Sequence, residues 1–274
     1  MLISSLPKRI LRRARRSLGL DLDRFLWSAR GVIHVGASVG QERAQYAGLG
    51  LEVLWVEPIP EVFATLRANI AALPRQNALQ ALVADIDGRD YEFHIANNAG
   101  QSSSILELKD HRDVWPEVSF TKSITIRGTT LPTLLAREGI DVSRYDALIM
   151  DTQGSERMVL KGAAAVLPHF NYIKTEAADF EIYEGCAQLK DLTAFLATYG
   201  FAERARSRFA SRAAGGHSRM RRTAPAVTPV ASASVRGRPH FPQFPKRETN
   251  ADCIAISRTH SPWRTVSSVC SRIL

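Results

Sequence analysis

The sequence is poor in the features that mark secreted, metal-binding and membrane-spanning proteins. Its 274 residues include three cysteines, Cys186, Cys253 and Cys270, which are widely spaced and form no CxxC pair. Neither a disulfide framework nor a zinc site is therefore indicated. No apolar run approaches the roughly 20 residues of a membrane span, and basic residues occupy the N-terminal positions where a signal peptide needs its apolar core. These absences predict a cytoplasmic protein without a metal site.

Acidic residues are scarce at both ends of the chain, and this decides how the net charge of +9 is interpreted. Residues 1–20 carry six basic and no acidic side chains, and residues 204–274 carry fourteen basic and two acidic ones. The body, residues 21–203, is left with 16 basic and 25 acidic side chains. Basic ends on an acidic body say little about the function of that body. Nucleic acid is therefore not the expected partner.

The composition changes at the same boundaries as the charge. Residues 204–250 are rich in Arg, Ser, Ala and Pro without regular periodicity, which predicts a disordered insertion. Residues 251–258 (ADCIAISR) have the pattern of a final strand of the folded domain 21–203, and residues 259–274 are expected to form a flexible tail. In residues 1–20, apolar side chains lie among clustered Arg and Lys. Such a segment is either a frayed, solvated helix or a basic helix on an anionic membrane surface.

Short apolar runs alternate with helical patterns in the body of the chain. The runs are GVIHVG (31–36), EVLWVE (52–57), ALQALVAD (78–85), YDALIMD (145–151) and FNYIKTE (170–176). Helical periodicity follows Pro60 and Ser155. This alternation predicts an α/β fold with a doubly wound, mostly parallel sheet. Alternating side chains in DYEFHIA (90–96) and KSITIRG (122–128) predict extra strands, antiparallel or at the edge.

The turn after the first expected strand carries the functional signal. In VIHVGASVGQE, Gly36 and Gly40 allow a ligand to approach the backbone and the next helix to pack closely. Glu57 ends the second expected strand 21 residues after Gly36, which is the place and spacing of a carboxylate that binds ribose hydroxyls. The turn lacks the GxGxxG of pyrophosphate sites and the GK[ST] of triphosphate sites. An adenosine ligand without a pyrophosphate, S-adenosylmethionine, fits best, with Asp85 accepting from the adenine amino group.

Several stretches together resemble a known family. VIHVGASVGQE, VEPIPEVFATLRANI, DALIMDTQGSERMVLKGA and IKTEAADFEIYEG are similar in order and spacing to FkbM-type S-adenosylmethionine-dependent methyltransferases, from about Gly31 to Phe201. The resemblance implies a class I, Rossmann-like methyltransferase fold. It also implies O-methylation of a hydroxyl on a sugar, glycan or secondary metabolite. His34 and Ser38 depart from the family pattern, since many members carry Asp and Asn there.

The expected cofactor contacts come from the ends of the first four strands and from one polar loop. They are His34, Val35, Gly36, Ala37, Ser38, Gly40, Glu42, Glu57, Pro58, Asp85, Ile86, Ser103 and Asp151. His34 also has a plainer interpretation as a satisfied core residue of a buried strand. The loop NNAGQSSS (97–104) is long for a bare connection, and one interpretation is that it lines the acceptor site.

Methyl transfer to a hydroxyl is an in-line displacement, so holding the acceptor oxygen in line supplies much of the acceleration. The acceptor must also lose a proton, which a carboxylate or a His can take. Asp151 is the first candidate for this role or for orienting the substrate, and Glu176 and Glu156 are the second candidates. An equally weighted interpretation is that Asp151 organises the DTQGSE loop and caps the helix that follows.

Other functions remain compatible with parts of the sequence. A nucleic-acid methyltransferase would use the basic ends, although no [DN]PP[YFW] motif follows YDALIMD. A catalytically idle module that binds S-adenosylhomocysteine and a nicotinamide reductase are further alternatives. The identity of the acceptor and the oligomeric state are not encoded in the fold or the cofactor turn.

Overall fold

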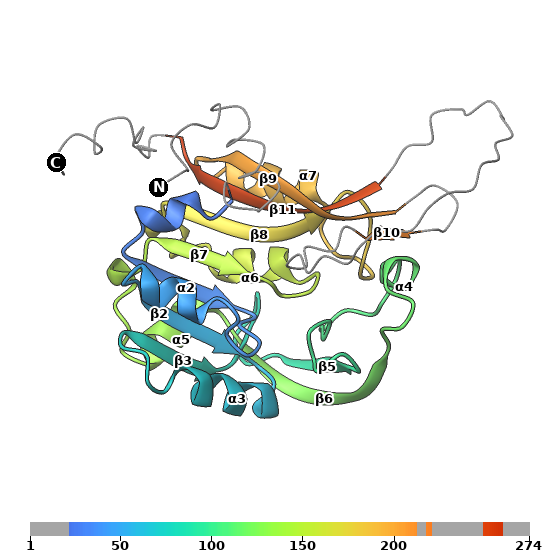
Figure 1. The fold of residues 1–274 in the computed structure, drawn as a ribbon, viewed down its shortest axis with the longest axis horizontal. Coiled ribbons are helices and arrows are strands. Elements are labelled where there is room, and N and C mark those ends of the chain that lie inside the picture. Colours follow the sequence, from blue (N-terminus) through green and yellow to red (C-terminus); the bar gives the residue numbers. More distant parts are fainter. Residues whose placement is uncertain (1–21, 213–217, 221–248, 260–274) are drawn as a thin grey trace, which may run out of the picture.

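The computed structural model describes residues 22–212, 218–220 and 249–259, and an eight-stranded sheet forms its centre (Figure 1). The strand order is β10-β9-β11-β8-β7-β1-β2-β3. The strands are β1 (Gly31–Val35), β2 (Glu52–Glu57), β3 (Gln76–Gln80), β7 (Ala147–Met150), β8 (Tyr172–Ala178), β9 (Phe201–Arg212), β10 (Ser218–Met220) and β11 (Thr249–Arg258). β1, β2, β3, β7 and β8 pair in parallel, whereas β11 is antiparallel to β8 and β9. The predicted mostly parallel sheet is confirmed.

Both faces of this sheet are covered, which is why its central strands are apolar along their whole length. Every residue of β1 is buried, with Ile33 in one core cluster beside Leu148 and Val32 in the other beside Ile149. Alternate residues of a strand point to opposite faces. One face is covered by α5 (Leu131–Arg137), α6 (Glu156–Gly162) and α7 (Leu189–Ala197), and the other by η1 (Arg24–Trp27), α2 (Arg43–Gly48) and α3 (Pro60–Ile70). Short 3-10 turns, η2 (Val142–Arg144) and η3 (Leu167–His169), precede β7 and β8.

A second, three-stranded sheet of order β4-β6-β5 lies beside the main one (Figure 1). It consists of β4 (Leu82–Val83), β5 (Asp90–Ala96) and β6 (Phe120–Thr129), and α4 (His111–Val114) lies between β5 and β6 in the chain. The extra strands predicted over 90–96 and 122–128 are therefore present. The prediction of a single strand over 78–85 is wrong. The pairing with β2 ends at Gln80, and the chain pairs with β6 from Leu82. Leu82 and Ala84 are buried there against aromatic residues of β5.

Regular structure continues beyond the point where the sequence predicts that it ends. β9 runs to Arg212 and pairs with β11 from Phe201–Arg258 to Arg212–Thr249, so disorder from Arg204 onward is a wrong prediction for residues 204–212. The physical reason is that β11 pairs with β8 on one side only, so the backbone N–H and C=O groups on its other side need partners. β9 supplies them through its own backbone, and this pairing does not depend on its side chains. The predicted strand 251–258 is present within β11.

Some predictions fall on residues outside the described part of the chain. These are the basic N-terminal segment 1–20, most of the predicted insertion (213–217 and 221–248) and most of the C-terminal tail (260–274), and they stay predictions. Within residues 22–212, 218–220 and 249–259, no helix combines the length and the apolarity that crossing a membrane requires.

Candidate active site

A cavity of about 730 Å³ lies beyond the carboxyl ends of β1, β2 and β7. This volume falls within the roughly 300 to 1,000 Å³ of pockets that bind small molecules. One part of its wall is the turn after β1, and another is the loop 97–103 with the segment that follows from His111. In parallel sheets, ligands bind at the position where the strand order reverses, which here is between β1 and β7.

The turn after β1 has a backbone that only small residues allow. Gly36 has φ +78°, and a Cβ built on it would collide with the backbone carbonyl oxygen of Asp151. Ser38 also has a positive φ of 47°, and its N–H donates to Glu57 Oε2 at 2.8 Å. Gly40 serves helix packing instead, because a Cβ there would lie 2.8 Å from Leu66 Cδ1 of α3. The turn therefore brings bare backbone to the cavity beside the end of β2.

Glu57 ends β2 as a buried acceptor with 4% of its surface exposed. Its Oε1 accepts from Ile59 N at 3.0 Å and its Oε2 from Ser38 N at 2.8 Å. Each carboxylate oxygen has a second lone pair, so the group retains acceptor capacity toward the cavity that it lines. Burial raises the pKa of Glu57 to about 7, although the two backbone N–H groups oppose this shift. A ligand that donates hydroxyls to Glu57 would stabilise its charged form.

Acidic side chains form a wall beside the glycine turn. Asp151 after β7, Glu176 in β8 and Glu42 before α2 all line the cavity. Burial raises the pKa of Asp151 to about 6; the hydrogen bond from Gln153 opposes this shift, and the charge of Glu42 contributes to it. Burial and the charge of Asp151 raise the pKa of Glu176 well above its usual range. A cationic ligand would relieve this repulsion, and S-adenosylmethionine carries a sulfonium and an ammonium.

Two buried polar atoms have no hydrogen-bond partner among the described residues, and both belong to residues that line the cavity. They are Thr152 Oγ1 and His111 Nδ1. Such groups are rare in folded proteins and require an explanation. Thr152 lies beside Gly36, since its Cγ2 would be 3.4 Å from a Cβ built on that glycine. The unpartnered hydroxyl, the glycine turn, Glu57 and the acidic wall together fit a polar, positively charged adenosine ligand.

Most of the predicted site residues meet in this cavity. Those that line it are His34, Val35, Gly36, Ala37, Ser38, Glu42, Glu57, Pro58, Ser103, Asp151 and Glu176. His34 is also satisfied as a core residue, with Nδ1 3.4 Å from the Tyr46 hydroxyl and its ring stacked on Trp55. Burial lowers the pKa of His34 to about 3. His34 is thus a neutral packing residue whose edge reaches the cavity.

Four predicted residues do not line the cavity. Gly40 packs against α3, and Ile86 is 47% exposed on the surface. Asp85 accepts from the Tyr91 hydroxyl at 2.7 Å, because the break between β3 and β4 carries it into the small sheet. Glu156 Oε1 accepts from the N–H groups of Thr152 and Gly154 at 3.1 and 3.2 Å. Glu156 therefore organises the loop after β7, while burial raises its pKa to about 7.

The far wall of the cavity contains residues that the sequence analysis missed. The polar loop contributes Asn97, Asn98, Gly100, Gln101, Ser102 and Ser103, as one interpretation of that loop expects, and the missed residues are His111, Trp115, Glu117, Val118 and Ile182. No local pattern distinguishes His111 or Trp115, since each is a single side chain in an irregular stretch. Their position depends on the antiparallel pairing of β5 with β6, which folds the intervening chain back toward the main sheet.

Comparisons with known proteins find methyltransferases that are similar to this chain. The 2-O-methyltransferase NoeI of Sinorhizobium fredii is 27% identical over 176 residues, which cover 61% of this chain and 71% of that protein. The likeness to solved structures is looser. The precorrin-6y C5,15-methyltransferase of Geobacter metallireducens has a TM-score of 0.40 at 12% identity, covering 94% of this chain and 93% of that one. Magnesium protoporphyrin IX methyltransferase of Synechocystis, with bound SAM, has a TM-score of 0.39 at 12% identity, covering 93% and 99%.

The family assignment comes from the domain that contains the cavity. The methyltransferase FkbM domain matches residues 34–203, from the end of β1 to the start of β9. This span includes all the residues that line the cavity, from His34 to Ile182. The chain belongs to the FkbM methyltransferase family.

Proposed function

We propose that this protein transfers the methyl group of S-adenosylmethionine to a hydroxyl of a sugar or glycan. The observation that carries the proposal is a single cavity in which a glycine turn with a buried carboxylate, Glu57, faces a polar loop from the small sheet. The similarity to a 2-O-methyltransferase supports oxygen as the methylated atom. The family alone leaves the acceptor open, because function depends on the site and not on the fold.

The cofactor half of the site has a residue for each part of S-adenosylmethionine. Glu57 is suited to accept from the ribose hydroxyls, and apolar residues beside it, Ile59 and Leu82, suit the adenine. Asp151 and Glu42 carry negative charge on the side of the glycine turn, which suits the cationic methionine end. When bound there, the cofactor supplies a methyl group on a positively charged sulfur. Asp85, the adenine partner expected from the sequence, lies outside this arrangement.

The acceptor half of the site suits a molecule with many hydroxyl groups. Asn97, Asn98 and Gln101 offer both donors and acceptors at the cavity wall. The loop that carries them is internally braced, since Asn98 exchanges hydrogen bonds with Ser102 at 2.9 and 3.1 Å. Trp115 adds an aromatic surface to the same wall. A polar, preorganised loop with one aromatic side chain favours a sugar over a purely apolar acceptor.

Asp151 is the residue that joins the two halves. It follows β7 directly, lines the cavity and is held by the Gln153 amide. Gln153 Oε1 in turn accepts from the Tyr183 hydroxyl at 2.8 Å. This chain of hydrogen bonds fixes the orientation of the Asp151 carboxylate. Glu156 contributes indirectly, because it holds the backbone of the loop that contains Asp151 and Gln153.

The test is methyl transfer from radiolabelled S-adenosylmethionine to a panel of methyl glycosides, nucleotide sugars and lipid-linked sugars, with RNA and DNA as further arms. Transfer to a glycan, with a mass gain of one methylene group, is the expected result. Glu57→Ala should abolish labelling at low cofactor concentration, whereas Glu92→Ala, an exposed change on β5, should not. Labelling confined to RNA or DNA would replace the proposal with the nucleic-acid alternative. Thermal stabilisation by NADH without any response to S-adenosylhomocysteine would refute both.

A further inference from the structure

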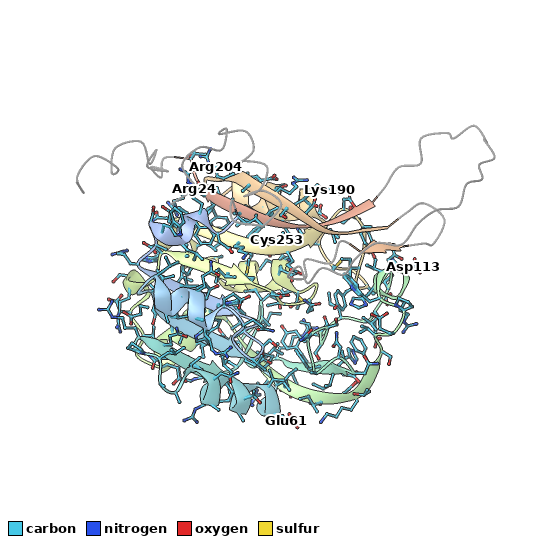
Figure 2. All side chains as sticks on the ribbon, in the orientation of Figure 1. Arg24, Glu61, Asp113, Lys190, Arg204 and Cys253 are labelled. Atoms are coloured by element: carbon cyan, nitrogen blue, oxygen red, sulfur yellow. The ribbon has the colours of Figure 1, made fainter. Side chains whose placement is uncertain are left out.

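His111 lies in the wall of the cavity that belongs to the acceptor half. It begins α4, which lies beyond the carboxyl ends of β2 and β7 (Figure 1). The exposed Asp113 marks the outer side of this helix at the edge of the molecule (Figure 2). His111 and Val114 are buried on its other side, with 2% and 3% exposed. His111 is thus carried inward to the cavity by the same turn that exposes its neighbours.

Two aromatic rings pack against the imidazole of His111 and hold it in place. Its centroid lies 4.7 Å from that of Trp115 and 5.3 Å from that of Tyr183. Its Nδ1 is buried and has no hydrogen-bond partner in the described part of the chain. Tyr183 is itself fixed, because its hydroxyl donates to Gln153 Oε1 at 2.8 Å and lies 3.2 Å from a second acceptor, Ser102 O. The imidazole is thus packed rigidly in the wall of the cavity, with one nitrogen whose hydrogen-bonding capacity is unmet, which requires an explanation.

The environment of His111 favours the neutral imidazole. Burial lowers the pKa of His111 to about 4, although the charge of Glu117 opposes this shift. At neutral pH the ring is therefore neutral, and one nitrogen carries a lone pair. This weak base can take the hydroxyl proton once the oxygen has begun to bond to the methyl carbon, because the proton is then strongly acidic. Of the carboxylates considered from the sequence, Glu156 does not line the cavity and accepts from two backbone N–H groups, and Asp151 lies beside the glycine turn, on the side that suits the cationic methionine end. Burial and the charge of Asp151 raise the pKa of Glu176 well above its usual range, which favours the protonated carboxyl over the base.

We propose that His111 is a catalytic residue that hydrogen bonds the acceptor hydroxyl and takes its proton during methyl transfer. This assignment rests on the function proposed above. The acceptor oxygen forms a bond to the methyl carbon while the bond from that carbon to sulfur breaks, and the electron pair of the broken bond stays on sulfur. The hydroxyl proton moves to the imidazole, which becomes an imidazolium and then returns the proton to water. No oxidant or further reactant is needed.

Two substitutions test the role in the full-length protein. His111→Asn keeps a hydrogen-bonding side chain but removes the base, and His111→Ala removes both. The single-turnover rate of methyl transfer should fall about 100-fold or more in each, which is the usual contribution of a general base. S-adenosylhomocysteine affinity, measured by calorimetry, should stay within about threefold of wild type, since the cofactor half of the site is untouched. Added imidazole should restore part of the rate of His111→Ala.

His169→Asn is the matched control, because His169 is exposed on η3 and does not line the cavity. It should keep the wild-type rate. A readout independent of transfer is carbethoxylation of histidines by diethyl pyrocarbonate, followed by peptide mass mapping. A neutral imidazole that presents its nitrogen to the cavity should react, and the reaction should leave S-adenosylhomocysteine binding intact.

The outcomes separate this inference from the proposed function. If His111→Asn methylates at the wild-type rate the glycan that wild type methylates, His111 is not the base and the inference falls. If the wild-type protein binds S-adenosylhomocysteine but methylates no glycan, the proposed function falls. In that case, carbethoxylation still tests whether His111 presents a reactive nitrogen. Modification of His111 in the folded protein, more slowly than that of the exposed His169, supports an accessible imidazole lone pair in the cavity, and no modification of His111 refutes it.

Discussion

Replacing Glu57 by Gln should change the pH dependence of stability more than the stability itself. Glu57 is 4% exposed, and its carboxylate accepts from the N–H groups of Ser38 and Ile59. Its pKa rises from 4.5 to about 7 on folding, chiefly through burial. Because the folded pKa is the higher one, the protonated form favours folding below pH 4.5, and this contribution is lost as the pH rises through 7.

The size of the effect follows from that shift. Between pH 5 and pH 8 the ionisation of Glu57 should cost the folded wild-type protein about 2 to 3 kcal/mol. Gln cannot ionise, so Glu57→Gln lacks this loss. Its amide oxygen can accept from one of the two backbone N–H groups, but its NH₂ faces the other, which costs about 1 to 3 kcal/mol at every pH. The wild type should therefore be the more stable protein at pH 5, and the two should be nearly equal at pH 8.

Urea unfolding at four pH values, followed by the fluorescence of tryptophans such as the buried Trp55, measures the difference between the two proteins. Subtracting the unfolding free energy of the variant from that of wild type at each pH cancels the contribution of the other buried carboxyls. Glu92→Gln, an exposed change, is the control and should differ from wild type by a constant amount. A difference for Glu57→Gln that stays within about 0.5 kcal/mol from pH 5 to pH 8 would refute the raised pKa. At pH 8 the variant should also bind S-adenosylhomocysteine about 10- to 100-fold more weakly, as expected for a lost charge-assisted hydrogen bond.

Three further predictions concern the turn, the loop after β7 and the tail. Gly36→Ala should abolish S-adenosylhomocysteine binding in calorimetry, whereas Gly50→Ala, at a similar positive φ but with nothing within 4 Å of its Cβ, should leave binding unchanged. Glu156→Ala should lower the unfolding free energy by about 2 to 4 kcal/mol, because two backbone donors lose their acceptor. Glu156→Gln should keep both stability and methyl transfer, and a stable but inactive Glu156→Gln would make Glu156 catalytic. Replacing residues 221–248 with a short Gly-Ser linker should leave cofactor affinity unchanged, since the described cavity wall ends at Ile182; a tenfold loss would contradict this.

The parts of the fold that the sequence predicts well are those whose signal is local. β1, β2, β7 and β8 are apolar runs because helices cover both of their faces, and that burial is visible in each run alone. Gly36 and Glu57 are predictable for a similar reason. Gly36 is predictable because its backbone has a positive φ and leaves no room for a Cβ. Glu57 is predictable because it ends a strand at the edge of the sheet where ligands bind.

β9 shows where a local signal fails. Its side chains are largely polar and basic, so nothing in the pattern from Arg204 to Arg212 indicates burial. The strand forms because β11 presents an unsatisfied edge. Its register partners on β11 are 37 residues away for Thr249–Arg212 and 57 residues away for Arg258–Phe201. Backbone pairing of this kind depends on which strand is adjacent and leaves little trace in the side chains.

The sequence by itself determined the central parallel strands, the glycine turn after β1 and the family, because each depends on short patterns of burial and backbone geometry. Only the tertiary structure decided the chemistry around them. The break between β3 and β4 takes Asp85 out of the cavity, and the loop geometry after β7 turns Glu156 toward backbone N–H groups. The pairing of β5 with β6 brings His111 and Trp115 to the acceptor wall. These placements depend on contacts between segments that are distant in the sequence. The role of each side chain is therefore set by the residues and the cavity that it contacts in the folded protein.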